Sequence, residues 1–335
     1  MNFIKPEVVM INEKDPYKKI ELAGRTCYKS EAKITDDSAI KFVQALIKRE
    51  HYAMLEHQIF LFKVFDNSLT HDYIEFLKQD KYLHVTSEMV KDDSSFKLRH
   101  LVSGSVRAVC QRNINDPIFQ CLYSKYPNLC FGLGCLLDPM YDEENNVCFV
   151  DLEKEISTFS VNELLEHVYF TFKIITDRGV THELVRHRPC SFAQESTRYV
   201  NYKDGLSIAL PFEFYRKPDD VQLLYQEAFE SSERLYRSLI EYGETPQQAR
   251  AVLPTATKTE IVITTNLKEY IHILNLRYKG TTGTPHPDIK IIAEMIYNLI
   301  KDNFYKNIVF DINNLLNMDS KKLNMSQYLR SLKDV

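Results

Sequence analysis

Three short runs rich in β-branched and aromatic residues, set among long helical patterns, most constrain what this chain can fold into. QIFLFKV at 58–64, VYFTFKII at 168–175 and KTEIVITT at 258–265 have the length and composition of buried strands. The chain of 335 residues is long enough for one elaborated domain or for two. Buried strands among amphipathic helices predict a globular fold with a large core.

Helical periodicity and capping residues surround these strands. Apolar residues recur at helical spacing from Thr35 to Glu50, and a second long pattern from Val221 to Tyr242 ends at Gly243. The other expected helices are 180–188, carrying several cations, 246–253, containing Arg250, 266–277, capped by Asn266, and one that starts at Pro287.

The domain organisation follows from a change in pattern. Residues 65–165 place polar clusters between short apolar runs, and they are interpreted as an insertion into a single domain of residues 1–318. A polar tail, 319–335, follows.

Composition and charge exclude several classes of protein. With 44% hydrophobic and 26% charged residues, the chain is not disordered as a whole. A net charge of −4 gives no field that would hold the protein on nucleic acid or an acidic membrane, so neither partner is expected. Seven cysteines without a CxxC pair, and a start without a signal-peptide pattern, favour reduced thiols in the cytoplasm.

The densest chemistry lies in RHRPCSFAQESTRYVNY, residues 186–202. Guanidinium groups bind phosphate oxygens bidentately, and hydroxyl groups add neutral donors, so this mixture suits a phosphorylated ligand. A solvated basic surface is the alternative. The polar groups are Arg186, His187, Arg188, Ser191, Ser196, Thr197 and Arg198.

Two side chains in this segment, Cys190 and Ser196, are possible nucleophiles, but each also has an ordinary structural interpretation. Cys190 lies near cations that would lower the pKa of its thiol, but a lone cysteine is more often a buried packing residue. Ser196 lacks the G-x-S-x-G turn of a hydrolase nucleophile.

Metal and dinucleotide motifs are weak or missing. The pairs Glu56-His57 and Glu166-His167, with His51, could suggest a metal, but they are far apart and hydrogen-bonded histidines are the simpler interpretation. No metal is expected. Neither GxGxxG nor GxxxxGK[ST] occurs, so a bound dinucleotide would be held by side chains.

Four segments resemble the flavin-dependent thymidylate synthases. Arg186-His187-Arg188, seven residues and then Ser196 is similar to that family's RHR-x7-S signature. ARAVLP at 249–254 followed by TTNLKEYIHILNLR at 264–277, HYAMLEH at 51–57 and RTCYKS at 25–30 resemble further family segments.

The resemblance implies a fold and an activity. The fold would be α/β, a mixed, largely antiparallel sheet with flanking helices. The reaction would be reductive methylation of dUMP to dTMP, with methylenetetrahydrofolate as carbon donor, NADPH as reductant and FAD as the redox carrier. The family's sites form between subunits of a homotetramer, so self-association is implied.

The resemblance also assigns roles by position. Flavin contacts would come from His51, Arg186, His187, Arg188, Asn266, Leu267, Lys268 and His272. Contacts to dUMP would come from Glu183, Arg186, Gln194, Glu195, Ser196, Thr197, Arg198, Arg250 and Arg277. Ser196 and Arg277 are the catalytic candidates, and Gln194 and Glu195 remain alternatives for one nucleotide-facing position.

Three rival functions remain open at this stage. Pro189-Cys190 imitates the pair of cysteine-dependent thymidylate synthases. The cations with Phe192, Tyr199 and Tyr202 could form a nucleic-acid surface. A non-catalytic nucleotide-binding protein would hold dUMP without flavin.

Overall fold

A four-stranded antiparallel sheet lies at the centre of the molecule. The computed structural model describes residues 1–65, 70–92, 95–131 and 147–304. The strand order is β2 (Glu7–Met10), β7 (Tyr169–Asp177), β10 (Lys258–Asn266) and β8 (Ser191–Gln194). Strand β10 pairs on both sides, and every residue from Thr259 to Asn266 is buried, as its β-branched composition predicts.

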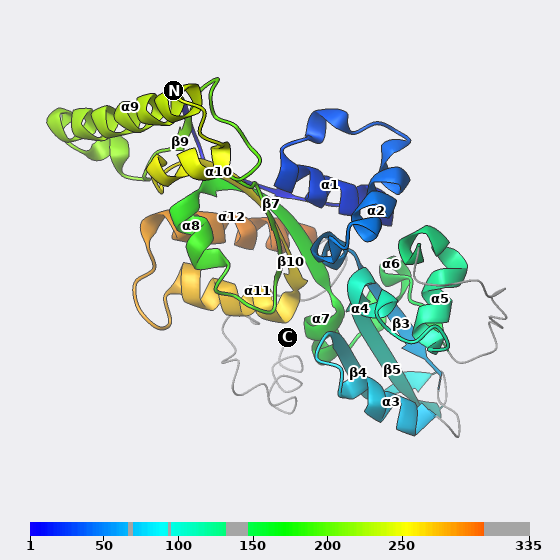
Figure 1. Ribbon diagram of the computed structural model, residues 1–335. Coiled ribbons are helices and arrows are strands. Elements are labelled where there is room, and N and C mark those ends of the chain that lie inside the picture. The colour runs from blue at the N-terminus through cyan, green and yellow to red at the C-terminus, as the bar shows by residue number, and fades with distance from the viewer. Residues whose placement is uncertain (66–69, 93–94, 132–146, 305–335) are drawn as a thin grey trace.

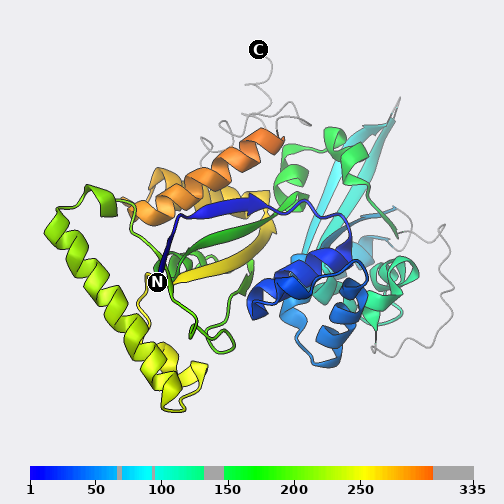
Figure 2. The ribbon, with the colours of Figure 1, turned by 90° about the horizontal axis from the view of Figure 1, so that it is seen from above.

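Helices cover both faces of this central sheet. One face packs on α7 (Val161–His167), α11 (Leu267–Leu274) and α12 (Pro287–Phe304), and this core contains Phe172, Ile263 and Tyr270. The other face packs on α1 (Pro16–Tyr28), and Figures 1 and 2 show α1 and α12 on opposite sides of β7 and β10.

The expected insertion builds a second antiparallel sheet onto the predicted strand at 58–64. Its order is β4 (Leu83–Asp92), β5 (Ser95–Ser105), β3 (Ile59–Val64) and β6 (Val147–Phe149). Figure 1 shows this sheet beside the central one. The accompanying helices are α2 (Ser38–Lys48), α3 (Thr70–Lys78), α4 (Val106–Cys110), α5 (Pro117–Lys125) and α6 (Leu152–Glu155).

A third, smaller core supports the long helix α9 (Asp219–Glu241). Phe229 and Tyr236 of α9 pack on Ile208 of β9 (Ser207–Ala209), which pairs in parallel with β1 (Asn2–Ile4). The short helix α10 (Pro246–Ala249) follows and is closed by a capping box between Thr245 and Gln248. Helix α9 lies at one end of the molecule (Figure 2).

Most predicted elements are confirmed, including the strands β3, β7 and β10 and the helices α2, α9, α11 and α12. The expected α/β class, with largely antiparallel sheets and flanking helices, is also confirmed. No helix among the described residues is long and apolar enough to cross a membrane. The expected tail, 319–335, lies outside the described residues.

The helix predicted at 180–188 is partly wrong. Helix α8 runs from Arg178 to Leu184, so the three cations follow it. Pro189 disfavours helical geometry at the preceding residue, and a turn in which the Cys190 N–H donates to the carbonyl of His187 replaces the helix.

Candidate active site

The RHR-x7-S motif lies across strand β8, so its two ends are held apart. Arg186, His187 and Arg188 precede the strand, and Ser196 follows it. Four strand residues span about 13 Å at ~3.3 Å each. Arg186 and Arg188 are exposed and His187 is buried.

His187 is the centre of the first group of site residues. Its Nδ1 lies 3.3 Å from Oε1 of Glu269, and its ring centroid lies 5.7 Å from that of His272. Both partners belong to α11, which begins where the Asn266 side chain accepts the Glu269 N–H at 3.0 Å. The RHR segment and the segment expected to complete the flavin site are therefore neighbours.

Arg277 joins this group from a π-helical turn, η7 (Asn275–Lys279). Its Nη1 donates to Oε2 of Glu183 at 2.7 Å, and its Nε donates to Nε2 of His187 at 3.4 Å. Because Nε2 accepts this bond, the hydrogen-bond pattern is that of a neutral His187 whose Nδ1–H faces Glu269. Such π-helical turns occur often at functional sites.

Three potential metal ligands also meet in this group. The ligand atoms of His187, Glu269 and His272 lie within 4.8 Å of one another, a cluster that no spacing in the sequence signalled. In the described part of the chain, the pairs considered from the sequence form no such group. Instead His57 is hydrogen-bonded to Thr264, at 2.9 Å.

Residues 266–268 are tied to the end of α7. The Leu267 N–H donates to the carbonyl of Val168 at 2.8 Å, and Leu267 is fully buried. Lys268 is largely exposed, and its Nζ lies 2.5 Å from Oε1 of Glu166. Burial alone raises the pKa of Glu166, but hydrogen bonds from His84 and Lys268 outweigh burial and lower that pKa to about 2.

The second group of site residues follows β8. Nη1 of Arg250 donates to Oγ1 of Thr197 at 3.4 Å, and Nε of Arg198 donates to Oε1 of Gln247 at 2.9 Å. Arg198 and Arg250 are exposed. The Ser196 hydroxyl accepts the Arg198 N–H at 3.3 Å, so hydroxyl and guanidinium groups share one small loop.

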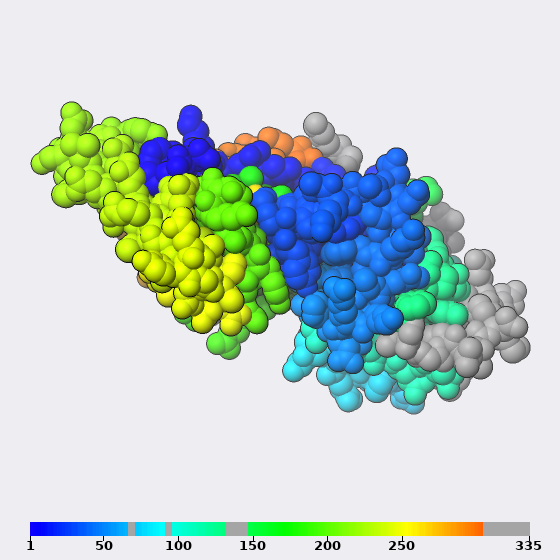
Figure 3. Space-filling model, turned by 45° about the horizontal axis from the view of Figure 1, so that its top comes forward, coloured from blue at the N-terminus to red at the C-terminus, as the bar shows by residue number. Residues whose placement is uncertain are grey.

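His51 is linked to the loop of the second group indirectly, through Tyr28. Its Nδ1 lies 2.8 Å from the Tyr28 hydroxyl, and the Tyr28 ring lies 5.7 Å from that of Tyr199. In the space-filling view, the N-terminal helices (blue) and the α9–α10 region (yellow) flank part of the green middle of the chain on one face (Figure 3).

Gln194 and Glu195 both have partners inside the protein. Gln194 donates to the hydroxyls of Thr181 at 2.8 Å and Thr259 at 3.2 Å. The buried Glu195 accepts from the Tyr202 hydroxyl at 2.8 Å and from Lys258 Nζ at 2.9 Å. Glu195 therefore anchors the loop that carries Ser196.

An ionic cluster behind this loop was not predicted from the sequence. Glu260 of β10, almost fully buried, pairs with Lys29, Lys173 and Lys258. The sequence feature that could have indicated this cluster is a glutamate in the middle of a strand predicted to be buried. The cluster links the C-terminal end of α1 to the Ser196 loop, since the Ser196 N–H also donates to the carbonyl of Cys27 at 3.0 Å.

Cys190 does not have the environment of a nucleophile. Burial, reinforced by the negative charge of Glu269, raises the pKa of its thiol to about 12. The thiol is half-buried and packs against the core that contains Tyr270.

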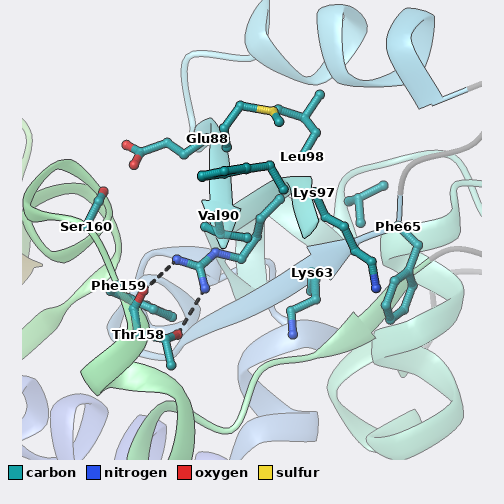
Figure 4. Close-up of a pocket in the computed structure, with 13 residues that line it drawn as sticks. Lys63, Phe65, Glu88, Val90, Lys97, Leu98, Thr158, Phe159 and Ser160 are labelled. Carbon is teal, nitrogen blue, oxygen red and sulfur yellow. Dashed lines mark hydrogen bonds between the residues drawn. The ribbon is translucent and has the colours of Figure 1, made fainter. Parts of the chain in front are cut away.

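A wide cavity of about 1210 Å³ lies elsewhere, on the second sheet. Figure 4 shows Lys63 and Lys97 on one side of it and Thr158 to Ser160 on the other. It is lined by none of the residues that the sequence singles out. Lys63 is paired with Glu155 at 2.6 Å, and Arg99 is paired with Glu163 in the same wall, so these two cations are already neutralised.

The two groups of site residues stay separate in one protomer. Among the described residues, no hydrogen bond or ion pair runs directly between the His187–Arg277 group and the Ser196–Arg250 group. A smaller cavity, of about 450 Å³, reaches Glu183 of the first group.

Solved structures give a weak similarity. A UMP/dUMP methylase, PolB from Streptomyces cacaoi bound with 5-Br dUMP, is 15% identical with a TM-score of 0.39, and the alignment covers 92% of this chain and 93% of PolB.

Curated relatives give a closer sequence match. A flavin-dependent thymidylate synthase from Geobacter sulfurreducens is 36% identical over 125 residues, which is 37% of this chain and 53% of the relative. One from Pyrococcus furiosus is 34% identical over 136 residues, covering 38% and 54%. The chain thus spans about half the length of the curated relatives it matches.

A family model provides the decisive comparison. The model described as thymidylate synthase complementing protein matches residues 136–304, half of the chain, and so includes the RHR motif, α11 and η7. This protein therefore belongs to the thymidylate synthase complementing protein family.

Proposed function

We propose that this protein is a flavin-dependent thymidylate synthase that reductively methylates dUMP to dTMP, with methylenetetrahydrofolate as carbon donor and NADPH as reductant. The observation that carries the proposal is the pairing of the RHR segment with α11 and η7. His187 bonds to Glu269 and Arg277 there, although 82 and 90 positions separate them from it. The family membership supports the same activity.

The first group fits FAD by its donor chemistry. A flavin dinucleotide brings a diphosphate, which needs cations, and ring carbonyls, which need donors. Arg186 and Arg188 offer exposed cations, Lys268 offers an exposed ammonium group whose charge Glu166 balances in part, and the exposed His272 offers a ring N–H. Bound FAD would supply the hydride transfer that no side chain can perform.

The second group would hold the dUMP phosphate. The guanidinium groups of Arg198 and Arg250 are exposed beside the hydroxyls of Ser196 and Thr197. Glu195 and Glu260 would act from behind this loop by fixing its backbone, and Gln194 would act with them.

Arg277 would act on the pyrimidine. Its guanidinium is held by Glu183 and His187, so its orientation is fixed before substrate binds. A cation at the uracil amide stabilises the negative charge that develops there as C5 attacks carbon, which lowers the barrier to methylation.

The assembly follows from the separation of the two groups. We propose a homotetramer in which the flavin group of one protomer faces the phosphate group of another, built from a single domain, residues 1–318, with its insertion. This arrangement would join the two groups without requiring the roughly 13 Å of β8 to be bridged within one chain.

Three measurements test the proposal. Purified protein should be yellow with a flavin spectrum, and it should release tritium from C5-labelled dUMP only when NADPH and the folate are present. Activity should survive dialysis against a chelator, because the cluster around His187 is proposed to serve flavin. Colourless protein that binds dUMP without turnover would instead support the nucleotide-binding alternative.

A further inference from the structure

Strand β4 of the insertion is linked by hydrogen bonds to Lys268, in the segment proposed to bind flavin. His84 of β4 lies outside the 136–304 family match, and its Nδ1 lies 2.9 Å from Oε2 of Glu166. The other oxygen of that carboxylate lies 2.5 Å from Nζ of Lys268. One carboxylate therefore joins a residue of the insertion to a residue expected to contact flavin.

The same face of the β4–β5 hairpin holds the end of α7 in place. The Thr86 and Ser103 hydroxyls flank the ring of the buried His167, at 2.8 Å from Nε2 and 2.9 Å from Nδ1. His84 and Ser103 are cross-strand partners in this hairpin. The hairpin therefore forms hydrogen bonds with two adjacent residues at the end of α7, Glu166 and His167. These bonds restrict the position of Glu166 relative to the insertion.

The chemistry of the His84 contact is fixed by the charge of its partner. Glu166 is ionised at neutral pH because its pKa is about 2, so its oxygens only accept hydrogen bonds. The Nδ1 of His84 therefore carries a proton and donates a hydrogen bond to Oε2. This leaves Oε1 directed to Lys268, whose side chain is 62% exposed. An exposed lysine side chain samples many rotamers unless a partner restricts it.

We propose that His84 is a positioning residue that acts through Glu166 to orient Lys268 for binding the cofactor. The inference rests on the proposed function, because it assigns a purpose to the insertion of a flavin enzyme. His84 itself touches neither reacting atom nor cofactor. Its contribution is to restrict one carboxylate, so that the ammonium group of Lys268 would be held in one orientation for the phosphate groups that FAD brings.

A double-mutant cycle on FAD binding tests this role. The apoprotein is titrated with FAD, and the quenching of flavin fluorescence gives the Kd. His84→Ala should raise the Kd about three- to tenfold, the loss expected for one hydrogen bond of ordinary net strength. In a Lys268→Ala background the same change should have no further effect. His84→Asn, whose amide N–H can replace Nδ1–H, should restore binding.

The control is His71→Ala, which removes an exposed histidine from α3 of the same insertion. Equal Kd values for wild type and His84→Ala, or additive effects in the double mutant, would overturn the inference and leave the proposed function intact. Wild-type apoprotein that fails to bind FAD would overturn both.

Discussion

Arg277 is the residue whose replacement should separate substrate chemistry from cofactor binding. Its guanidinium contacts Glu183 and His187 in a fixed orientation. Arg277→Ala should lower tritium release from C5 of dUMP by about 100- to 1,000-fold, the loss expected for one charge-stabilising donor. Flavin absorbance per protomer should fall far less. Equal losses in turnover and in flavin content would show that Arg277 is a cofactor ligand instead.

Cys190 should be dispensable. The pKa of its thiol is raised to about 12, so the thiol stays protonated and a poor nucleophile through the neutral range. Cys190→Ala should keep turnover close to that of the wild type. In the wild-type protein, iodoacetamide should alkylate the Cys190 thiol only slowly. An inactive Cys190→Ala protein that still binds FAD and dUMP would favour the cysteine-dependent mechanism.

For single residues, the sequence indicated which residue types could form a site better than it indicated the hydrogen-bond partners of those residues. From the motif alone, the segment 186–198 could be proposed as a site, because residues near one another in a chain stay near in the fold. It could not tell where Gln194 and Glu195 point, since the Thr259 hydroxyl and the Lys258 ammonium that bind them come from a strand about 65 positions away.

Strand β10 carries an ionic cluster that should make stability depend on pH. Burial alone raises the pKa of Glu260, but hydrogen bonds from Lys173, Lys258 and Lys29 outweigh burial and lower that pKa from 4.5 to about 2. A lowered carboxylate pKa adds stability above pH 4.5 that is lost as the pH falls towards 2, and it amounts to on the order of 3 kcal/mol.

Glu260→Gln should therefore lower the free energy of unfolding at neutral pH and flatten its fall below pH 4.5. Urea denaturation at several pH values measures both effects. The control is Glu153→Gln, which breaks an exposed ion pair with Lys14 and should change little. A Glu260→Gln protein with wild-type stability at neutral pH would show that the cluster contributes nothing net.

Elements were predictable where composition or spacing matches burial. Strand β10 is rich in β-branched residues and buried along almost its whole length, and helix α12 buries apolar residues at helical spacing. Both are found where the sequence places them. The β4–β5 hairpin was not predicted, because its inward face carries polar residues such as Thr86 and Ser103. These residues are buried by hydrogen bonding to His167, and that partner becomes visible only in the fold.

At the scale of the whole molecule, the two proposed half-sites, the His187–Arg277 group for flavin and the Ser196–Arg250 group for phosphate, lie apart within one protomer. Their separation leads to a prediction about assembly. If flavin and dUMP bind where half-sites of different subunits meet, a defect in one half-site can be compensated by the other subunit. Arg186→Ala damages the proposed flavin half, and Arg198→Ala damages the proposed phosphate half. The two variants differ in half-site, although their positions are only twelve residues apart.

Each variant alone should be nearly inactive, and co-expression of the two should restore part of the activity, because some interfaces then combine two intact halves. Co-expression of Arg186→Ala with Arg188→Ala is the matched control. Both of these changes damage the same half, so every mixed interface stays defective and no activity should return. Tritium release by the co-purified oligomers measures the outcome. If Arg186→Ala and Arg198→Ala fail to complement while each chain still binds its partner, both halves must act within one protomer, and β8 would have to be spanned by the ligands themselves.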